Sequence, residues 1–207
     1  MMNNETASNN AIVRVWKWLK KPSTSALGSV LFFGMFGGAL LWGAFNWTIE
    51  LSNTEAFCIS CHEMEENPYM EVRETIHYSN RSGVRATCPD CHVPKGWIYK
   101  VARKISATNE LWHKVLGTID TREKYEDRRL ELAIMEWKRM KKTDSQECRN
   151  CHDYDYMDYS EQGRRSSRIH EEGFERGETC IDCHKGIAHR LPPMDEELIN
   201  LRLSKLD

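Results

Sequence analysis

Every cysteine of the 207-residue chain belongs to one repeated pattern, in which two cysteines three positions apart are followed directly by a histidine. The eight cysteines are Cys58, Cys61, Cys88, Cys91, Cys148, Cys151, Cys180 and Cys183. The four adjacent histidines are His62, His92, His152 and His184. Two thiols at this spacing can add to the vinyl groups of one porphyrin, and the next histidine then lies under the iron as an axial ligand. Four copies of the pattern predict four covalently attached c-type haems.

Disulfide bonds and zinc sites also account for many cysteines in other proteins. A zinc site would need two Cys-x-x-Cys pairs to share one metal, and it would leave the four following histidines unexplained. The pattern uses all eight cysteines, so none remains for a disulfide framework. Because c-type haem is attached outside the cytoplasm, the pattern also predicts that this part of the chain is exported.

The sixth ligand of each iron must come from elsewhere. Four histidines lie outside the motifs, namely His77, His113, His170 and His189. His77 follows the first motif histidine by 15 residues and His170 follows the third by 18, whereas His113 has no counterpart. We therefore expect His77, His170 and His189 to be ligands, the first two in equivalent roles, and His113 not to be one. Met64, two residues after His62, is a further candidate for the first haem, because methionine sulfur also binds haem iron.

These spacings describe two dihaem halves, about 55–96 and 145–190, joined by a connector over 97–144. The connector lacks Gly and Pro from Thr121 to Lys142, which predicts a helix, with Asp120 and Glu123 as a capping box. A shorter helix is expected from about Trp97 to Leu116. Strand patterns are nearly absent, so we expect a mainly α fold with little or no β structure, in which the porphyrins supply much of the core.

One face of the connector helix is apolar. The stripe recurs every three or four residues, at Leu130, Ile134, Trp137 and Met140. This is the spacing of one helix face. We expect the stripe to pack against the haems.

The sequence of the N-terminal region predicts a membrane anchor. Residues 1–21 form a basic tail, and residues 22–48 carry no charge, which is long enough for a transmembrane helix. Positive charge before the span and Glu50 after it predict a cytoplasmic N-terminus, an inner-membrane single-pass topology and a periplasmic domain over 49–207. A cleaved signal peptide would also be apolar, but its apolar region would be shorter. Gly34 and Gly38 could form a dimer face within the lipid bilayer.

The net charge excludes another class of partner. At −2 it does not supply the basic field that nucleic-acid binding requires, so we expect no nucleic-acid partner.

Four segments resemble the NapC/NirT family of membrane-anchored multihaem quinol dehydrogenases, which also includes NrfH and CymA. They are Cys58–Met64, Asn80–Pro94, Ser145–His152 and Cys180–His189. The resemblance extends over nearly the whole chain. It implies that electrons from menaquinol or ubiquinol in the membrane pass through the four haems to a periplasmic reductase, or its cytochrome subunit, of the nitrate or nitrite type.

The resemblance also implies site residues. It makes Met64 an iron ligand of the first haem, and Lys104 and Glu110 the residues that line a quinol site. In that role Glu110 accepts a proton and Lys104 hydrogen-bonds a quinol oxygen. Their six-residue spacing does not put them on one stripe of an ideal helix, so an irregular turn would be needed. Lys95 stands where some relatives carry histidine, which leaves Lys95, His113 or a partner's residue open as the sixth ligand of the second haem.

Two other functions fit the motifs. The first is a tethered electron-transfer module without a quinol site, which another membrane protein would reduce. The second is a haem enzyme that reduces a small oxyanion. No spare cluster of His, Tyr and Arg surrounds any motif, so the sequence favours electron transfer over oxyanion catalysis.

Overall fold

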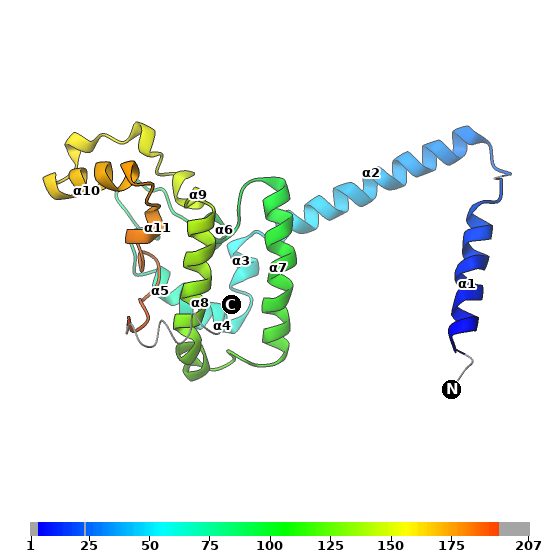
Figure 1. Ribbon diagram of the computed structural model, residues 1–207, viewed down its shortest axis with the longest axis horizontal. Coiled ribbons are helices and arrows are strands. Elements are labelled where there is room, and N and C mark those ends of the chain that lie inside the picture. The colour runs from blue at the N-terminus through cyan, green and yellow to red at the C-terminus, as the bar shows by residue number, and fades with distance from the viewer. Residues whose placement is uncertain (1–3, 23, 195–207) are drawn as a thin grey trace. The chain divides into compact units, whose positions relative to one another are not determined.

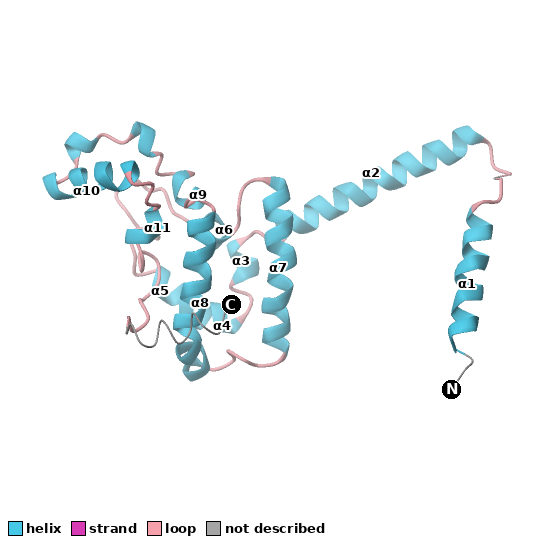
Figure 2. Ribbon diagram, in the orientation of Figure 1, coloured by secondary structure: helices cyan, strands magenta, loops and turns pink. Residues whose placement is uncertain are grey.

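A computed structural model of the chain describes residues 4–22 and 24–194. It divides into two compact units, Met1–Trp47 and Thr48–Asp207. The described residues form helices and loops without a strand, which confirms the mainly α prediction (Figure 2).

The first unit consists of two helices, α1 (Asn4–Leu19) and most of α2 (Leu27–Leu51). Pro22 lies in the break between them. α2 has 25 residues, or roughly 37 Å at 1.5 Å per residue, which exceeds the roughly 30 Å of a bilayer's hydrocarbon core. None of its most apolar window is buried, so by length and composition α2 could cross a membrane. It starts and ends a few residues later than the uncharged segment 22–48.

The glycine pair in α2 is open on its helix face. Apart from the adjoining residues and the backbone of its own helix, a Cβ added at Gly34 or Gly38 would meet no atom of the described residues within 4 Å. Dimerisation through this face stays a prediction.

The second unit contains two long helices and several short ones (Figure 1). The long helices are α7 (Trp97–Val115) and α8 (Arg122–Lys142), as the connector pattern predicts. The short α-helices are α3 (Glu55–Cys58), α4 (His62–Met64), α5 (Met70–Val72), α6 (Cys88–His92), α9 (Gln146–Arg149), α10 (Arg164–Glu175) and α11 (Cys180–Cys183). A π-helical turn, η1 (Glu65–Tyr69), joins α4 to α5, and two 3₁₀ turns, η2 (Tyr154–Tyr156) and η3 (Tyr159–Glu161), precede α10.

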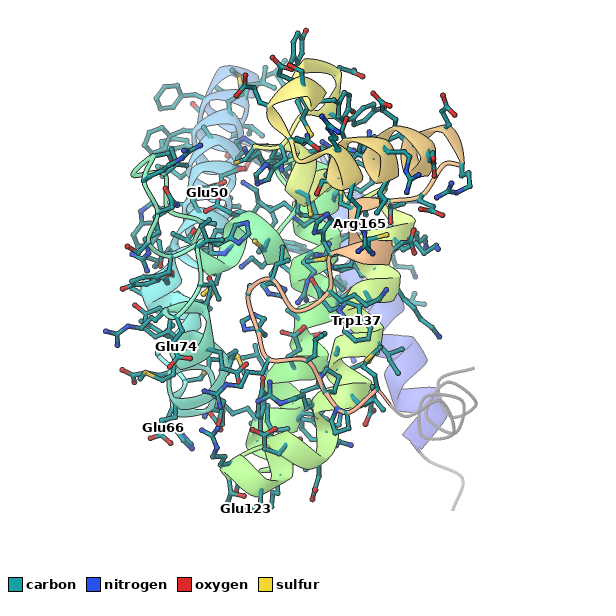
Figure 3. All side chains as sticks on the ribbon, turned by 90° about the vertical axis from the view of Figure 1, so that its left-hand side faces the viewer. Glu50, Glu66, Glu74, Glu123, Trp137 and Arg165 are labelled. Atoms are coloured by element: carbon teal, nitrogen blue, oxygen red, sulfur yellow. The ribbon has the colours of Figure 1, made fainter. Side chains whose placement is uncertain are left out.

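Helix α8 is the centre of the second unit. Three residues of its predicted apolar stripe, Leu130, Ile134 and Met140, are buried. Trp137, which Figure 3 labels on this helix, is half-buried. The Lys185 ammonium lies 5.6 Å from its ring centroid. The expected capping box was wrong by one residue, because the Thr121 side chain accepts the Lys124 N–H and caps the helix.

The interior of the second unit is as polar as it is apolar. Among the described residues, six apolar and six polar or charged side chains are buried. A buried charge is stable only when it is paired. Arg129 on α8 meets this condition, because its two terminal nitrogens lie 2.6 and 2.9 Å from the carboxylate of Glu71 on α5. Ion pairs therefore connect the short helices to α8.

Candidate haem-binding site

The eight cysteines lie on or beside short helices, and contacts bring them together in the order of the four motifs. In the first half, the side chains of Cys58 and Cys88 are in hydrogen-bonding contact, and in the second half Cys148 and Cys180 are. Between the halves, α6 packs against α9, and Cys91 interacts electrostatically with Cys151. All eight thiols are free, which fits thioether attachment. The arrangement forms a continuous series from the first motif to the fourth.

The second motif of each half begins with the same local structure. Thr87 and Thr179 precede the first cysteine of α6 and of α11, and each forms a capping box with an aspartate, Asp90 or Asp182. The caps fix where these two helices start and therefore where both of their thiols point. Sequence reasoning missed this feature, although Thr-Cys-x-Asp-Cys occurs in both halves.

Six of the eight histidines form three facing pairs. The ring centroids are 6.2 Å apart for His77 and His152, 6.1 Å for His92 and His189, and 5.8 Å for His170 and His184. Two imidazoles bound to opposite sides of one metal have centroids roughly 6 Å apart, since each metal–nitrogen bond is about 2 Å. Each pair combines one motif histidine with one of the three expected sixth ligands. The spacing and the donor set fit a haem iron between each pair.

Two of the three pairs join the two halves. His77 of the first half faces His152 of the second, and His189 of the second half faces His92 of the first. The expected equivalence of His77 and His170 therefore does not hold, because His170 faces His184 of its own half. Similar sequence gaps do not fix the direction in which a loop turns. Here the Ala86 N–H donates to the His77 carbonyl oxygen and holds His77 beside the segment that leads into α6.

His113 and Lys95 stand outside these pairs. The Nδ1 atom of His113 is buried and has no hydrogen-bond partner in the described part of the chain, so this side chain is not simply solvated. Lys95 is exposed, whereas His189 faces His92. The geometry therefore offers His189, and not Lys95, as the sixth ligand of the second haem.

The ring nitrogens of two paired histidines are oriented by neighbouring side chains. His92 Nδ1 lies 2.9 Å from Glu136 Oε1, and His170 Nδ1 lies 2.6 Å from Gln162 Oε1. An oxygen acceptor on Nδ1–H fixes the tautomer and leaves Nε2 free for a metal. Burial acts to raise the pKa of Glu136, but hydrogen bonds from His92 and Arg139 outweigh it and lower the pKa to about 2.

His62 differs from the other motif histidines. Its Nε2 lies 3.2 Å from the backbone oxygen of Asp120, and its Nδ1 lies 3.4 Å from the carboxylate of Glu63. Glu63 is buried and accepts two hydrogen bonds from Lys114 of α7, at 2.6 and 2.7 Å. Both ring nitrogens of His62 therefore have protein partners, while Met64 is half-buried on the same short helix.

The two residues expected at a quinol site lie on α7 but have different partners. Lys104 Nζ donates to the Ser52 carbonyl at 2.7 Å, and burial lowers its pKa. Glu110 pairs with Arg103 at 2.8 Å and is 63% exposed. α7 is a regular α-helix through both residues, so the irregular turn that would align them is absent there. Lys104 also interacts electrostatically with Cys58 of the first motif.

Known proteins are similar to this chain over the region that carries the four motifs. The family model described as "NapC/NirT cytochrome c family, N-terminal region" matches residues 20–194. The cytochrome c-type protein NapC of Escherichia coli K12 is 52% identical over 195 residues, covering 94% of this chain and 98% of the relative. The denitrification system component NirT of Stutzerimonas stutzeri is 56% identical over 181 residues, covering 86% and 90%.

A protein of Allochromatium vinosum that carries the name "Putative tetraheme cytochrome-c type" is also similar, at 49% identity over 173 residues, covering 84% of this chain and 91% of the relative. No solved structure matches the chain significantly.

Proposed function

The chain belongs to the NapC/NirT cytochrome c family, and on this basis we propose that it oxidises membrane quinol and passes the electrons to a periplasmic reductase. It is a tetrahaem c-type cytochrome of electron transport. One relative is named as a component of a denitrification system, which supports a nitrate or nitrite reductase, or its cytochrome subunit, as the acceptor.

The proposed ligand sets follow from the histidine pairs. His92 and His189 hold the second iron, His77 and His152 the third, and His170 and His184 the fourth. Met64 holds the first iron, while the Asp120 carbonyl retains the His62 ring. Each haem takes up and releases one electron at a time, and the four lie in motif order.

The position of α7 carries the quinol proposal. Lys104 Nζ bonds the carbonyl of Ser52, the residue after the end of α2, and Lys100 pairs with Glu50 at 2.6 Å. These contacts tie α7 to the end of the apolar helix. Large apolar side chains on α7 are exposed, among them Ile98, Ile105 and Trp112 at 73%, 66% and 60%. Their spacing of seven residues places them on one face, which suits a helix that lies at a membrane surface.

The two expected quinol residues take separate roles in this arrangement. Lys104, half-buried and near Cys58, would donate a hydrogen bond to a quinol oxygen beside the first haem. Glu110 is exposed, which supports a role in accepting a proton and releasing it to water. Because quinol oxidation releases two protons, the site requires such an exit.

The proposed topology places the basic N-terminal tail in the cytoplasm. Arg14, Lys17, Lys20 and Lys21 precede α2, and Glu50 near its end is the first acidic residue after the tail. This asymmetry matches the positive-inside rule. The haem-bearing unit then faces the periplasm from a single-pass anchor in the inner membrane.

Reduction of the purified holoprotein by menaquinol and ubiquinol analogues, followed through the haem spectrum, tests the proposal. Glu110→Gln keeps the side-chain shape and removes the base. It should slow quinol-driven reduction by roughly 10²-fold, the usual scale for loss of a general base. Lys104→Leu should weaken quinol binding in the same assay.

Two controls keep the assay specific. Both variants should keep their haem content and full reduction by dithionite. Glu172→Gln on α10 removes a carboxylate of comparable exposure, 52%, that pairs with Arg168 instead, and it should not change the rate. Parent rates in both α7 variants would show that the quinol site lies elsewhere. No reduction of the parent protein by either quinol would favour a tethered module reduced by another protein.

A further inference from the structure

We propose that two carboxylates, Glu136 and Glu71, give the second haem the lowest reduction potential of the three histidine-paired haems. This haem is the one attached through Cys88 and Cys91. The inference rests on the proposed ligation of its iron by His92 and His189.

Glu136 contacts the first of these ligands directly. Its Oε1 lies 2.9 Å from His92 Nδ1, and the carboxylate side chain is 22% exposed. A carboxylate that accepts the Nδ1 hydrogen bond gives the imidazole anionic character and makes it a stronger electron donor to its metal. Stronger donation favours the ferric state over the ferrous state, which lowers the reduction potential.

The charge of Glu136 is only partly neutralised by its neighbour. Arg139 contacts Glu136 at 2.7–3.1 Å and also pairs with Glu147 at 2.6 Å. Two carboxylates thus share one guanidinium, which leaves one net negative charge beside His92. Arg139 also donates to the Cys91 carbonyl at 3.0 Å, so the cluster is attached to the haem-binding motif itself.

The second ligand lies beside a similar cluster. His189 Nδ1 is 4.0 Å from Glu71 Oε2, and Glu71 accepts a hydrogen bond from the backbone N–H of Arg190 at 3.0 Å. Glu71 and Glu126 share Arg129, and the more exposed Glu126 is also contacted by Arg122 at 3.6 Å, so Glu71 supplies the buried carboxylate charge beside His189. A negative charge close to an iron in a poorly hydrated interior stabilises Fe(III) relative to Fe(II).

The other two histidine pairs do not have these features among the described contacts. His170 Nδ1 bonds the neutral amide of Gln162 at 2.6 Å. His77 Nδ1 is buried without a hydrogen-bond partner. Electrons should therefore reside less on the second haem than on the third and fourth.

The test is a mediated redox titration of the full holoprotein, with the electron paramagnetic resonance spectrum of the ferric haems recorded in parallel. Glu136→Gln retains an oxygen acceptor for His92 and removes the charge. One haem should shift to a higher potential and change its resonance, while the other three stay at their parent potentials. Four unchanged potentials in a fully haem-loaded variant would overturn the proposal.

Gln162→Glu is the matched reverse variant in the other half. It places a carboxylate on His170, and one haem, different from the one that Glu136→Gln affects, should shift to a lower potential. If Glu136→Gln lost haem, Gln162→Glu would decide. An unchanged potential in Gln162→Glu would overturn the claim that a carboxylate at the Nδ1 of a ligating histidine lowers the potential of its haem. The titration uses chemical mediators and no quinol, so its result is independent of the quinol site. If a variant keeps all the low-spin signals of the parent protein, its iron ligands are still bound. The potentials then test the carboxylate and not the proposed ligation.

Discussion

The two dihaem halves share their cysteine geometry but differ in how their ligands are held. Each half brings the first cysteines of its two motifs into contact, and each starts its second motif with a Thr–Asp capping box. In the first half, His92 is oriented by a charged carboxylate, whereas in the second His170 is oriented by a neutral amide. The repeat thus preserves haem attachment, while the environment of each iron is free to diverge.

The halves also differ in how deeply their charged contacts with α8 are buried. The first half uses the pair of Glu71 with Arg129, whose side chains are 5% and 7% exposed. The second uses the packing of α11 and the pair of Glu147 with Arg139, whose guanidinium side chain is 21% exposed. Within the second half, a neutral hydrogen bond runs from the Ile181 N–H to the Oγ of fully buried Ser145 at 3.1 Å. The buried charged pair of Glu71 should be more sensitive to loss of one partner than this neutral contact.

The largest expected effect comes from the ligand that crosses between the halves. His77→Ala should convert one low-spin haem to a high-spin or otherwise disturbed state, and that haem should be the third, attached in the second half through Cys148 and Cys151. The reason is that His77 faces His152. Electron paramagnetic resonance of the ferric protein measures the change. A variant that also lacks His152 should disturb the same haem, which identifies it as the third.

His113→Ala is the control for this variant. His113 faces no other histidine in the pairs described above, so the low-spin signals should remain unchanged. Loss of a low-spin signal in His113→Ala would show that the simple count of four bis-histidine haems is right and that Met64 is not the ligand of the first haem.

The buried ion pair of the first half should give the next largest effect. Glu71→Ala leaves the guanidinium of Arg129, whose side chain is 7% exposed, without its main partner. Removing one member of a buried pair costs about 3–5 kcal/mol in the free energy of unfolding. Urea denaturation of the holoprotein, followed by circular dichroism, measures the change. Lys141→Ala breaks a largely exposed pair with Asp182 and should change the midpoint little.

The neutral hydrogen bond within the second half should give a smaller effect. Ser145→Ala leaves the buried Ile181 N–H without its acceptor, which costs about 1–3 kcal/mol. Ser145 also has a left-handed backbone with φ of 50°, which alanine tolerates no better than serine, so strain is unchanged. A loss as large as that of Glu71→Ala in the same denaturation assay would contradict the contrast between the buried charged pair and the neutral hydrogen bond.

The sequence predicted the parts of this molecule that local patterns encode. The Cys-x-x-Cys-His spacing identified the haem attachments, and helical periodicity identified α7 and α8 with the buried face of α8. The connections between ligands were not predictable, because a loop such as 73–87 can turn toward either half. Glu136 was not singled out for the same reason, since it lies 44 residues from His92. Charged residues on a helix ordinarily face solvent, and only the fold shows which one meets a ligand.

The central claim is that three facing histidine pairs bind three haems and that the first haem is bound differently. Near-infrared magnetic circular dichroism of the fully ferric holoprotein tests it most directly, because bis-histidine and methionine-ligated haems have distinct charge-transfer bands. We expect bis-histidine intensity equivalent to three haems, and a fourth haem without this band whose signal changes in Met64→Ala. Bis-histidine intensity equivalent to four haems, unaffected by Met64→Ala, would contradict it.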